Sequence, residues 1–423
     1  MTIDTITVGG YANLKEVVLK MPDILALVAP NNYGKTNVLK AVKFGIDFIS
    51  PVSDKNRQMS RSQAIPLIEQ MVNDPFIFNV IIEMEGLIVE YGFSFIWARN
   101  MKNSKGAEII SESLKVKKVG DPKFKVYINR NEPNKASYLS SVEGRCSSSL
   151  SLDGKILAIN KLSNYDNLFY IDMIKSIERL SIKQINTLRN PDDFFSMLSM
   201  DAYLQDNSLA FPKTGQIGFF LNSLQTSMPD KFEILKDTIK QLLPEIEDIK
   251  PIKIDFAVNE RKKDLPFKMP DFFYDVRVKE KFFNQRVSFD YISSGSKRVI
   301  YILSMVIAAN LNKIDVITIE ELENSVHPRL LQNLLQAIST LAGNTKIIIT
   351  SHSPYLVKYL APSNLRFGLP KIKGVSCFKA LKESKLKKLS RMASSQELSV
   401  GEYMFDGMLD MDSNSEEYMS FFI

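Results

Sequence analysis

The 423-residue chain has little cysteine, histidine or tryptophan. Its 2 cysteines, Cys146 and Cys377, are far apart, and its 2 histidines are His327 and His352. Two isolated cysteines fit a reducing cytosol and argue against a disulfide scaffold. With so few ligands in no metal-binding spacing, a histidine–cysteine metal cluster is nearly excluded.

Long apolar runs are also lacking. No stretch approaches the roughly 18 residues of a membrane span, and the first residues do not show the basic-then-apolar pattern of a signal peptide. No sustained heptads appear, which argues against a long coiled coil. We therefore expect a cytoplasmic protein with a globular core and no membrane partner.

Positive charge is in slight excess and is local. The net charge is +6, and lysines gather in residues 115–125 and 379–391. Such patches can hold nucleic-acid phosphates. The alternative, a solvated helix face or hairpin, is favoured for each run.

A phosphate-loop pattern follows the apolar segment Ile24–Val28. The residues are Ala29-Pro30-Asn31-Asn32-Tyr33-Gly34-Lys35-Thr36, and Asn37–Phe48 then has apolar residues at helical spacing. In such a loop the backbone N–H groups hold phosphate, the lysine reaches the β- and γ-phosphates, and the hydroxyl binds Mg²⁺. Ala29 replaces the usual first glycine, a small perturbation if its backbone is not left-handed. The alternative is a chance Gly-Lys-Thr in a surface loop.

Two carboxylates end a second apolar segment, Val316–Ile319. Glu320 and Glu321 are expected at the carboxyl end of this strand, where open α/β sheets bind their ligands. By position we assign Glu320 to the metal and Glu321 to the attacking water. The alternative is a solvated acidic strand end.

The two histidines are interpreted differently. His352 ends the apolar strand 346–350, where an imidazole can contact a γ-phosphate and sense its loss; the alternative is a satisfied core histidine. His327, followed by Pro328, is expected to be structural, at a turn into a helix from Arg329.

The segment Ile292-Ser293-Ser294-Gly295-Ser296 precedes an apolar helix over 298–312. By itself it fits an ordinary helix cap made by Ser293 or Ser294. As a signature loop it needs a second copy of the chain, in which Ser293 and the N–H of Gly295 bind the γ-phosphate held by Lys35 of the partner subunit.

These motifs, in this order, resemble the ABC-type ATPases of the SMC, Rad50 and RecF superfamily. The branch that includes the ATPase half of OLD proteins and related prokaryotic defence ATPases is most similar. The resemblance covers about 1–98 and 286–360. Its residues are Pro30-Asn31-Asn32-x-Gly34-Lys35-Thr36-Asn37, Glu320-Glu321-x-Glu323-x-x-x-His327-Pro328 and Thr350-Ser351-His352-Ser353-Pro354.

The resemblance implies an α/β fold, an ABC-type P-loop ATPase head of two lobes with a mixed sheet and flanking helices, carrying an inserted arm or lid. It implies ATP and Mg²⁺ as cofactors and a homodimer with composite sites, with a higher homo-oligomer left open. The implied ATP-binding residues are Asn32, Gly34, Lys35, Thr36, Asn37, Ser293 and Gly295. Thr36 and Glu320 are the implied metal ligands, and Glu321 and His352 the catalytic residues.

The chain also departs from the family. Ser294 replaces a signature glycine and Leu322 replaces a proline, which leaves ATP binding expected but could slow turnover. The glutamine that contacts Mg²⁺ and phosphate in the family cannot be placed among Gln58, Gln63 and Gln70. No acidic cluster of the Toprim nuclease that follows in OLD proteins comes after His352.

The motifs divide the chain into four expected regions. Residues 1–98 carry the phosphate loop, 99–285 form the arm or lid, 286–370 carry the signature, carboxylates and His352, and 371–423 form a tail. Within the arm, 129–149 is expected to be loop. The tail, with aromatic and Met residues beside charge and a Phe421-Phe422-Ile423 end, is a candidate docking element; the alternative is a final helix packed on its own domain.

Two functions from different classes compete. The favoured hypothesis is a nucleotide-gated sensor or scaffold in prokaryotic antiphage defence, by analogy with PARIS- and Septu-type ATPases, that controls a separately encoded nuclease or toxin. The alternative is a DNA-maintenance ATPase of the RecF or Rad50 type, with DNA as ligand. A transporter subunit is disfavoured, because 258 residues separate Lys35 from Ser293.

Overall fold

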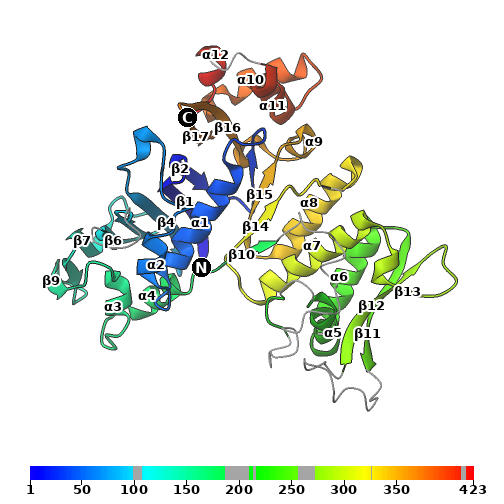
Figure 1. Ribbon diagram of the computed structural model, residues 1–423, viewed down its shortest axis with the longest axis horizontal. Helices are drawn as coiled ribbons and strands as arrows, with labels where there is room; N and C mark the ends of the chain where they lie inside the picture. The colour runs from blue at the N-terminus through cyan, green and yellow to red at the C-terminus, as the bar shows by residue number, and fades with distance from the viewer. Residues whose placement is uncertain (99–106, 186–208, 213–215, 256–271, 325, 411–415) are drawn as a thin grey trace. The chain divides into compact units, whose positions relative to one another are not determined.

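The computed structural model describes residues 1–98, 107–185, 209–212, 216–255, 272–324, 326–410 and 416–423 (Figure 1). The chain forms two compact units. The first holds residues Met1–Lys183 and Lys346–Ile423, and the second holds Gln184–Thr345. Both mix strands and helices, so the expected α/β class is confirmed: a mixed fold with a large sheet and flanking helices.

The first unit is built on one long sheet. Its strands run in the order β15-β3-β16-β17-β2-β1-β4-β5-β6-β7-β8-β9. Their bounds are β1 Thr2–Tyr11, β2 Leu14–Lys20, β3 Ile24–Val28, β4 Phe76–Met84, β5 Leu87–Phe95, β6 Ile109–Lys118, β7 Lys125–Glu132, β8 Lys135–Leu139, β9 Cys146–Ser151, β15 Lys346–Ser351, β16 Leu365–Ile372 and β17 Val375–Lys379.

Parallel pairing is concentrated around β3. This strand pairs in parallel with β15 on one side and β16 on the other, and all five of its residues are buried. A continuous apolar run is typical of a parallel strand covered on both faces. β3 therefore holds a fixed central position just before the phosphate loop.

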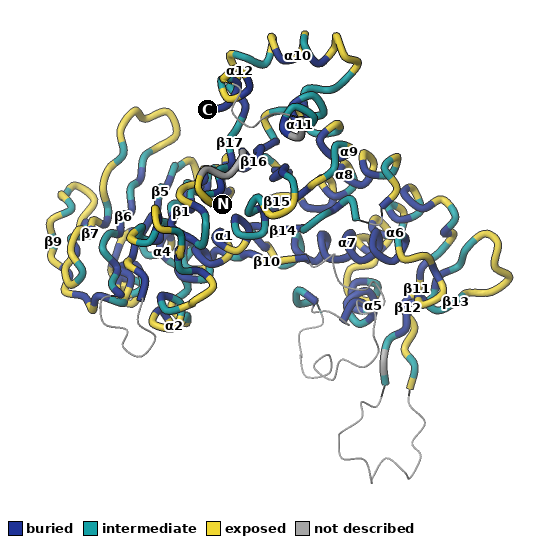
Figure 2. Tube along the Cα trace, turned by 45° about the horizontal axis from the view of Figure 1, so that its top comes forward, coloured by how far each residue is buried: buried dark blue, intermediate teal, exposed yellow. Residues whose placement is uncertain are grey.

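The rest of this sheet is mainly an antiparallel meander. β4 and β5 form a hairpin, in which Glu85 and Gly86 have φ of 51° and 76°, as a two-residue primed turn requires. The region expected as loop, 129–149, instead contributes to β7, β8 and β9. Buried Ala136 of β8 and Leu150 of β9 are each flanked by exposed or half-buried lysine or serine, which indicates that one face of these strands is covered (Figure 2).

Helix α1 (Lys35–Ile49) packs its apolar face on the sheet through an aromatic cluster. Phe44 lies 4.8 Å from Phe76 between ring centroids, and Phe48 lies 4.9 Å from Phe95. Such pairs contribute roughly 0.5–1.5 kcal/mol beyond their buried area. The helix that starts at Lys35 is thus fixed along its length.

Further short helices complete the first unit. They are α2 Lys55–Met59, α3 Ala158–Leu162, α4 Ile171–Glu178, α9 Pro354–Val357, α10 Leu386–Ser394, α11 Val400–Asp410 and α12 Glu416–Met419, with 3₁₀ turns η1 Glu69–Met71, η6 Pro362–Asn364 and η7 Glu383–Lys385. α3 is anchored by the buried carboxylate of Glu112, which accepts hydrogen bonds from the N–H groups of Ala158 at 2.6 Å and Ile159 at 3.0 Å.

The C-terminal end of the tail packs within the first unit. Phe421 and Phe422 are each 3% exposed, and Phe422 forms a bridge with Leu381. The Tyr418 hydroxyl donates to the Met404 carbonyl at 2.9 Å. The aromatic end of the tail is thus buried in its own unit, which fits the alternative of a tail packed on its own domain.

The second unit combines helices with the sheet β11-β12-β13 and with strands β10 and β14. Its elements are β10 Ile182–Ile185, which begins just before it, α5 Ile217–Ser227, α6 Pro229–Leu242, β11 Ile246–Asp255, β12 Phe272–Glu280, β13 Val287–Ser288, η5 Phe289–Tyr291, α7 Ser294–Leu311, β14 Val316–Glu320 and α8 Pro328–Ala342. α7 is buried along most of its length, as its dark colour in Figure 2 shows, and it contacts α5, α6 and α8. A helix apolar on all sides belongs in a core.

The two units divide the chain differently from the four expected regions. The expected arm up to Lys183 joins the first unit, whose sheet it extends through β6–β9, and the described arm residues from Gln184 on join 286–345 in the second. Residues 99–106, 186–208 and 256–271 of that arm lie outside the described part. Among the described helices, none is long and apolar enough to cross a membrane.

Candidate functional site

The phosphate loop joins β3 directly to α1. Gly34, at the helix N-cap, has φ 94°, and Asn32 has φ 67°. Two left-handed residues within three positions fold the loop tightly over the helix N-terminus, where free N–H groups and the helix dipole favour an anion. The strand–loop–helix expected from the sequence is present.

The Lys35 ammonium group lies inside this loop. Its Nζ donates to the carbonyl oxygens of Ala29 at 2.7 Å and Pro30 at 3.0 Å, and the side chain is 8% exposed. A cation held by the loop's own carbonyls is near the place where phosphate oxygens would sit. Thr36, next on the helix, is half-buried.

Ala29 fits the loop because a glycine faces it. Its φ is not positive, and its methyl group is fully buried. A Cβ built on Gly368 of β16 would lie 2.5 Å from the Ala29 Cβ. The space normally left by the loop glycine is supplied here by Gly368.

His352 follows the strand beside the loop. β15 pairs in parallel with β3, with Ser351 opposite Val28, and the Ser351 carbonyl accepts a 3.2 Å hydrogen bond from the Ala29 N–H. His352 is exposed at this edge. His352 therefore comes directly after Ser351, which is hydrogen-bonded to Ala29, the first residue of the phosphate loop. Because His352 is exposed, the alternative of a core histidine is wrong.

Asn37 has partners that the sequence analysis missed. Its amide donates to the Asn13 side chain at 2.7 Å, and Asn13 in turn donates to the Ser376 hydroxyl at 2.7 Å. These residues come from α1, the β1–β2 turn and β17. No local pattern could reveal a contact that spans 363 positions.

The paired carboxylates lie in the second unit, at the end of β14. Glu320 accepts a 2.7 Å hydrogen bond from the Gln184 amide. Glu321 has φ 50°, a left-handed conformation that costs a non-glycine residue roughly 1 kcal/mol or more. Leu322, which replaces a proline, is fully buried. The backbone therefore changes direction at Glu321.

Gln184 is a second residue that sequence reasoning missed. It lies in β10, outside the glutamines considered, and it contacts the carboxylate assigned to the metal. Gln63 and Gln70 are exposed, and the Gln58 amide oxygen is buried without a hydrogen-bond partner in the described part of the chain.

The signature segment acts as a helix cap in the single chain. The Ser293 Oγ accepts from the Ser296 N–H at 3.1 Å at the start of α7. Ser293 and Ser294 remain exposed, and Gly295 is half-buried. Ser293 is therefore a helix cap, as one of the two interpretations predicts. A phosphate bound to a partner subunit would meet an exposed segment.

His327 has the structural role expected of it. Its Nδ1 accepts a 3.3 Å hydrogen bond from the Arg329 N–H, which makes it the N-cap of α8, and Pro328 takes the first helical position. Proline is favoured there because its missing N–H would be unpaired.

The two metal ligands predicted from the sequence, Thr36 and Glu320, lie one in each unit. The described residues contain no group of three or more His, Cys, Asp or Glu side chains able to hold a metal. Mg²⁺ commonly takes one or two protein oxygens, with phosphate oxygens and water as its other ligands. A threonine hydroxyl and a glutamate carboxylate are oxygen ligands of that kind.

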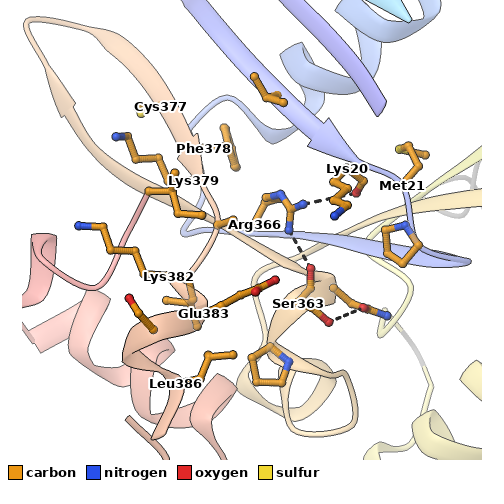
Figure 3. Close-up of a pocket in the computed structure, with 18 of the residues that line it drawn as sticks. Lys20, Met21, Ser363, Arg366, Cys377, Phe378, Lys379, Lys382, Glu383 and Leu386 are labelled. Carbon is orange, nitrogen blue, oxygen red and sulfur yellow. Dashed lines mark hydrogen bonds between the residues drawn. The ribbon is translucent and has the colours of Figure 1, made fainter. Parts of the chain in front are cut away.

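A pocket of about 1040 Å³ in the first unit contains none of these residues. Figure 3 shows Arg366 at its wall, donating to the carbonyls of Ser363 at 2.9 Å and Lys20 at 3.4 Å. Burial lowers the pKa of the Arg366 guanidinium. Because no phosphate-loop residue lines it, the pocket is a feature separate from that loop.

A family model described as "AAA domain, putative AbiEii toxin, Type IV TA system" matches residues 24–358. The chain belongs to this family. The match supports an ATP-binding P-loop ATPase, and it includes the phosphate loop, both carboxylates and His352.

Among solved structures, the chain is similar to the SMC head domain from Thermotoga maritima. The identity is 10%, with 90% of this chain and 100% of that chain covered, at a TM-score of 0.44. A second is an SmcHead bound to the C-winged helix domain of ScpA, with 12% identity, 92% and 100% coverage and a TM-score of 0.46. No curated protein matches the chain.

Proposed function

We propose that the chain binds ATP with Mg²⁺ and hydrolyses it, using the phosphate loop 29–36. The carrying observation is the buried Lys35 ammonium inside a loop closed by Gly34, with the His352 strand hydrogen-bonded beside it. The family match to an AAA domain supports the same activity.

Each residue then has a defined task. Lys35 and the loop N–H groups neutralise the β- and γ-phosphates, and Thr36 and Glu320 are the ligands offered to Mg²⁺, which would screen the phosphate charge. Glu321 orients the attacking water and takes its proton as the bond to phosphorus forms. His352 contacts the γ-phosphate and responds to its release.

We propose that two copies complete the reaction head to tail. The exposed Ser293 hydroxyl and the Gly295 N–H of one copy would bind the γ-phosphate in the other, and twofold symmetry would give two such sites. A higher homo-oligomer is compatible with this pairing.

The cellular role we propose is a nucleotide-gated sensor or scaffold in prokaryotic antiphage defence, akin to OLD-, PARIS- or Septu-type ATPases, acting in the cytoplasm. It would control a separately encoded nuclease or toxin. The family description, which names a toxin and a toxin–antitoxin system, supports this setting.

The basic runs do not favour the alternative, a DNA-maintenance ATPase. In the first run, Lys115 is paired with Glu90 at 3.1 Å and Lys117 stacks over Phe124 at 4.9 Å. In the second, Lys388 pairs with Glu417 at 2.9 Å. These contacts fit the solvated hairpin and helix face.

The test is Glu321→Gln in the full chain. We expect ATP to bind with near wild-type affinity, steady-state hydrolysis to fall roughly 10²-fold or more, and a dimer to accumulate with ATP in size-exclusion chromatography. Unchanged hydrolysis contradicts the assignment. Loss of hydrolysis in Glu320→Gln alone shows that the two carboxylate roles are reversed.

A further inference from the structure

Three side chains form a hydrogen-bonded chain beneath the phosphate loop. The Asn37 amide donates to the Asn13 Oδ1 at 2.7 Å, and the Asn13 amide donates to the Ser376 Oγ at 2.7 Å. The backbones join as well, because the Ser376 N–H donates to the Asn13 carbonyl at 2.8 Å. All three residues belong to the first unit.

The Asn13 and Ser376 side chains of this hydrogen-bonded series lie against Gly34. A Cβ built on Gly34 would be 2.6 Å from the Ser376 Oγ and 3.4 Å from the Asn13 Oδ1. Glycine is therefore required at position 34 for two reasons. Its φ of 94° disfavours other residues, and these side chains leave no room for a Cβ. Ser376 is 1% exposed, so its position is fixed by packing.

The contacts hold both ends of the loop's turn into the helix. Asn37 is the third residue of α1, and its amide ties the first helical turn, which carries Lys35 and Thr36, to Asn13. Gly34 rests on the same pair of residues. The loop is thus supported from the β1–β2 turn and from β17.

We propose that Asn13 and Ser376 are positioning residues for ATP. They hold Gly34 and the first turn of α1 in the conformation whose N–H groups converge on phosphate. The loop therefore loses less conformational entropy when ATP binds. Both residues lie outside the 24–358 family match. The proposal rests on the ATP binding proposed above.

The experiment compares Asn13→Ala, Ser376→Ala and the double variant with wild type in the full chain. The probe is a non-hydrolysable ATP analogue with Mg²⁺, measured by calorimetry. We expect each single variant to raise the Kd roughly three- to tenfold. The double variant should match Asn13→Ala within about twofold, because the two hydrogen-bonded side chains support Gly34 together and losing one removes the contribution of the other.

Two further readouts separate positioning from simple destabilisation. For ATP hydrolysis, KM should rise with the Kd while kcat at saturation stays within about twofold of wild type. The melting temperature without nucleotide should remain close to wild type. Cys377→Ala, at the next position on β17, is the matched control and should leave the Kd unchanged.

Wild-type Kd values in Asn13→Ala and Ser376→Ala overturn the proposal, as does a double variant whose effects simply add. A Kd change that merely follows a lowered melting temperature also overturns it. Failure of the proposed function looks different, because the wild-type chain itself would then not bind the analogue.

Discussion

At the scale of single residues, the phosphate loop depends on a complementary pair, Ala29 and Gly368. The pair explains how an alanine can replace the usual loop glycine: the methyl group of Ala29, just after β3, occupies space that Gly368 leaves open on β16. Sequence patterns show the replacement but not the partner, because Gly368 lies 339 positions away.

Gly368→Ala should therefore damage the loop. The new Cβ would lie 2.5 Å from the Ala29 Cβ and 3.1 Å from the Phe378 ring, and such overpacking costs about 1–3 kcal/mol. We expect a lower free energy of unfolding in urea and weaker ATP binding. Adding Ala29→Gly should restore part of both, and a double variant no better than Gly368→Ala would argue against the pairing.

Lys55 gives a pH dependence at the same scale. Its Nζ donates to the carbonyls of Phe48 and Ser50 and to the Ser53 hydroxyl, at the end of α1. Burial lowers its pKa from 10.5 to about 8, partly offset by Glu112 and Glu178. Between about pH 8 and 10.5 the unfolded chain binds this proton and the folded chain does not, so stability rises with pH there.

Comparison with Lys55→Met isolates this contribution. We expect the stability of wild type relative to the variant to increase from pH 8 to 10, by on the order of 3 kcal/mol at most. Lys43→Met, which changes an exposed lysine paired with Asp47 on the same helix, should show no such slope. A flat difference for Lys55→Met would mean that its amine is not held as described.

At the scale of elements, much of the fold follows from sequence periodicity. The apolar runs that precede the phosphate loop, Glu320 and His352 are strands, as the sequence predicts. β7–β9 were missed because strands covered on one face carry serine and lysine on the other. Pairing across the chain, such as β3 with β15 and β16, is fixed by tertiary packing and has no local signal.

The tail shows the same limit. Aromatic and Met residues occur both in interfaces and in cores, so the sequence does not distinguish the two. The structure places Phe422 in the core, 6.0 Å from Phe367 and 5.2 Å from Tyr418 between ring centroids. A docking role for the tail would have to use its exposed polar face.

Phe422→Ala should therefore destabilise the protein by roughly 3–5 kcal/mol, measured by urea unfolding. The matched control is Ile423→Ala, since this neighbouring side chain is 67% exposed and its loss should cost about 0.5 kcal/mol or less. Equal stability of the two variants would contradict the burial of the tail.

At the scale of the whole molecule, the proposed composite site predicts complementation between variants. Lys35→Ala removes the phosphate-loop cation, and Ser293→Arg blocks the exposed start of α7. A heterodimer of the two retains one intact pair of surfaces. Mixing the inactive proteins should restore part of the ATPase activity, and no restoration in mixtures shown to form heterodimers would favour a site within one chain.

The site itself was predictable only in part from the sequence. Lys35, Thr36 and His352 could be proposed as site residues because loop and strand motifs are local. Asn13, Ser376, Gly368 and Gln184 were not, because each acts through a contact distant in sequence.

The central claim is that the loop 29–36 binds ATP through Lys35, and calorimetry with ATP and Mg²⁺ tests it most directly. Wild-type protein and Lys40→Ala, which changes an exposed lysine on the same helix, should bind, and Lys35→Ala should show no measurable binding. Wild-type affinity in Lys35→Ala, or no binding by wild type, would contradict the claim.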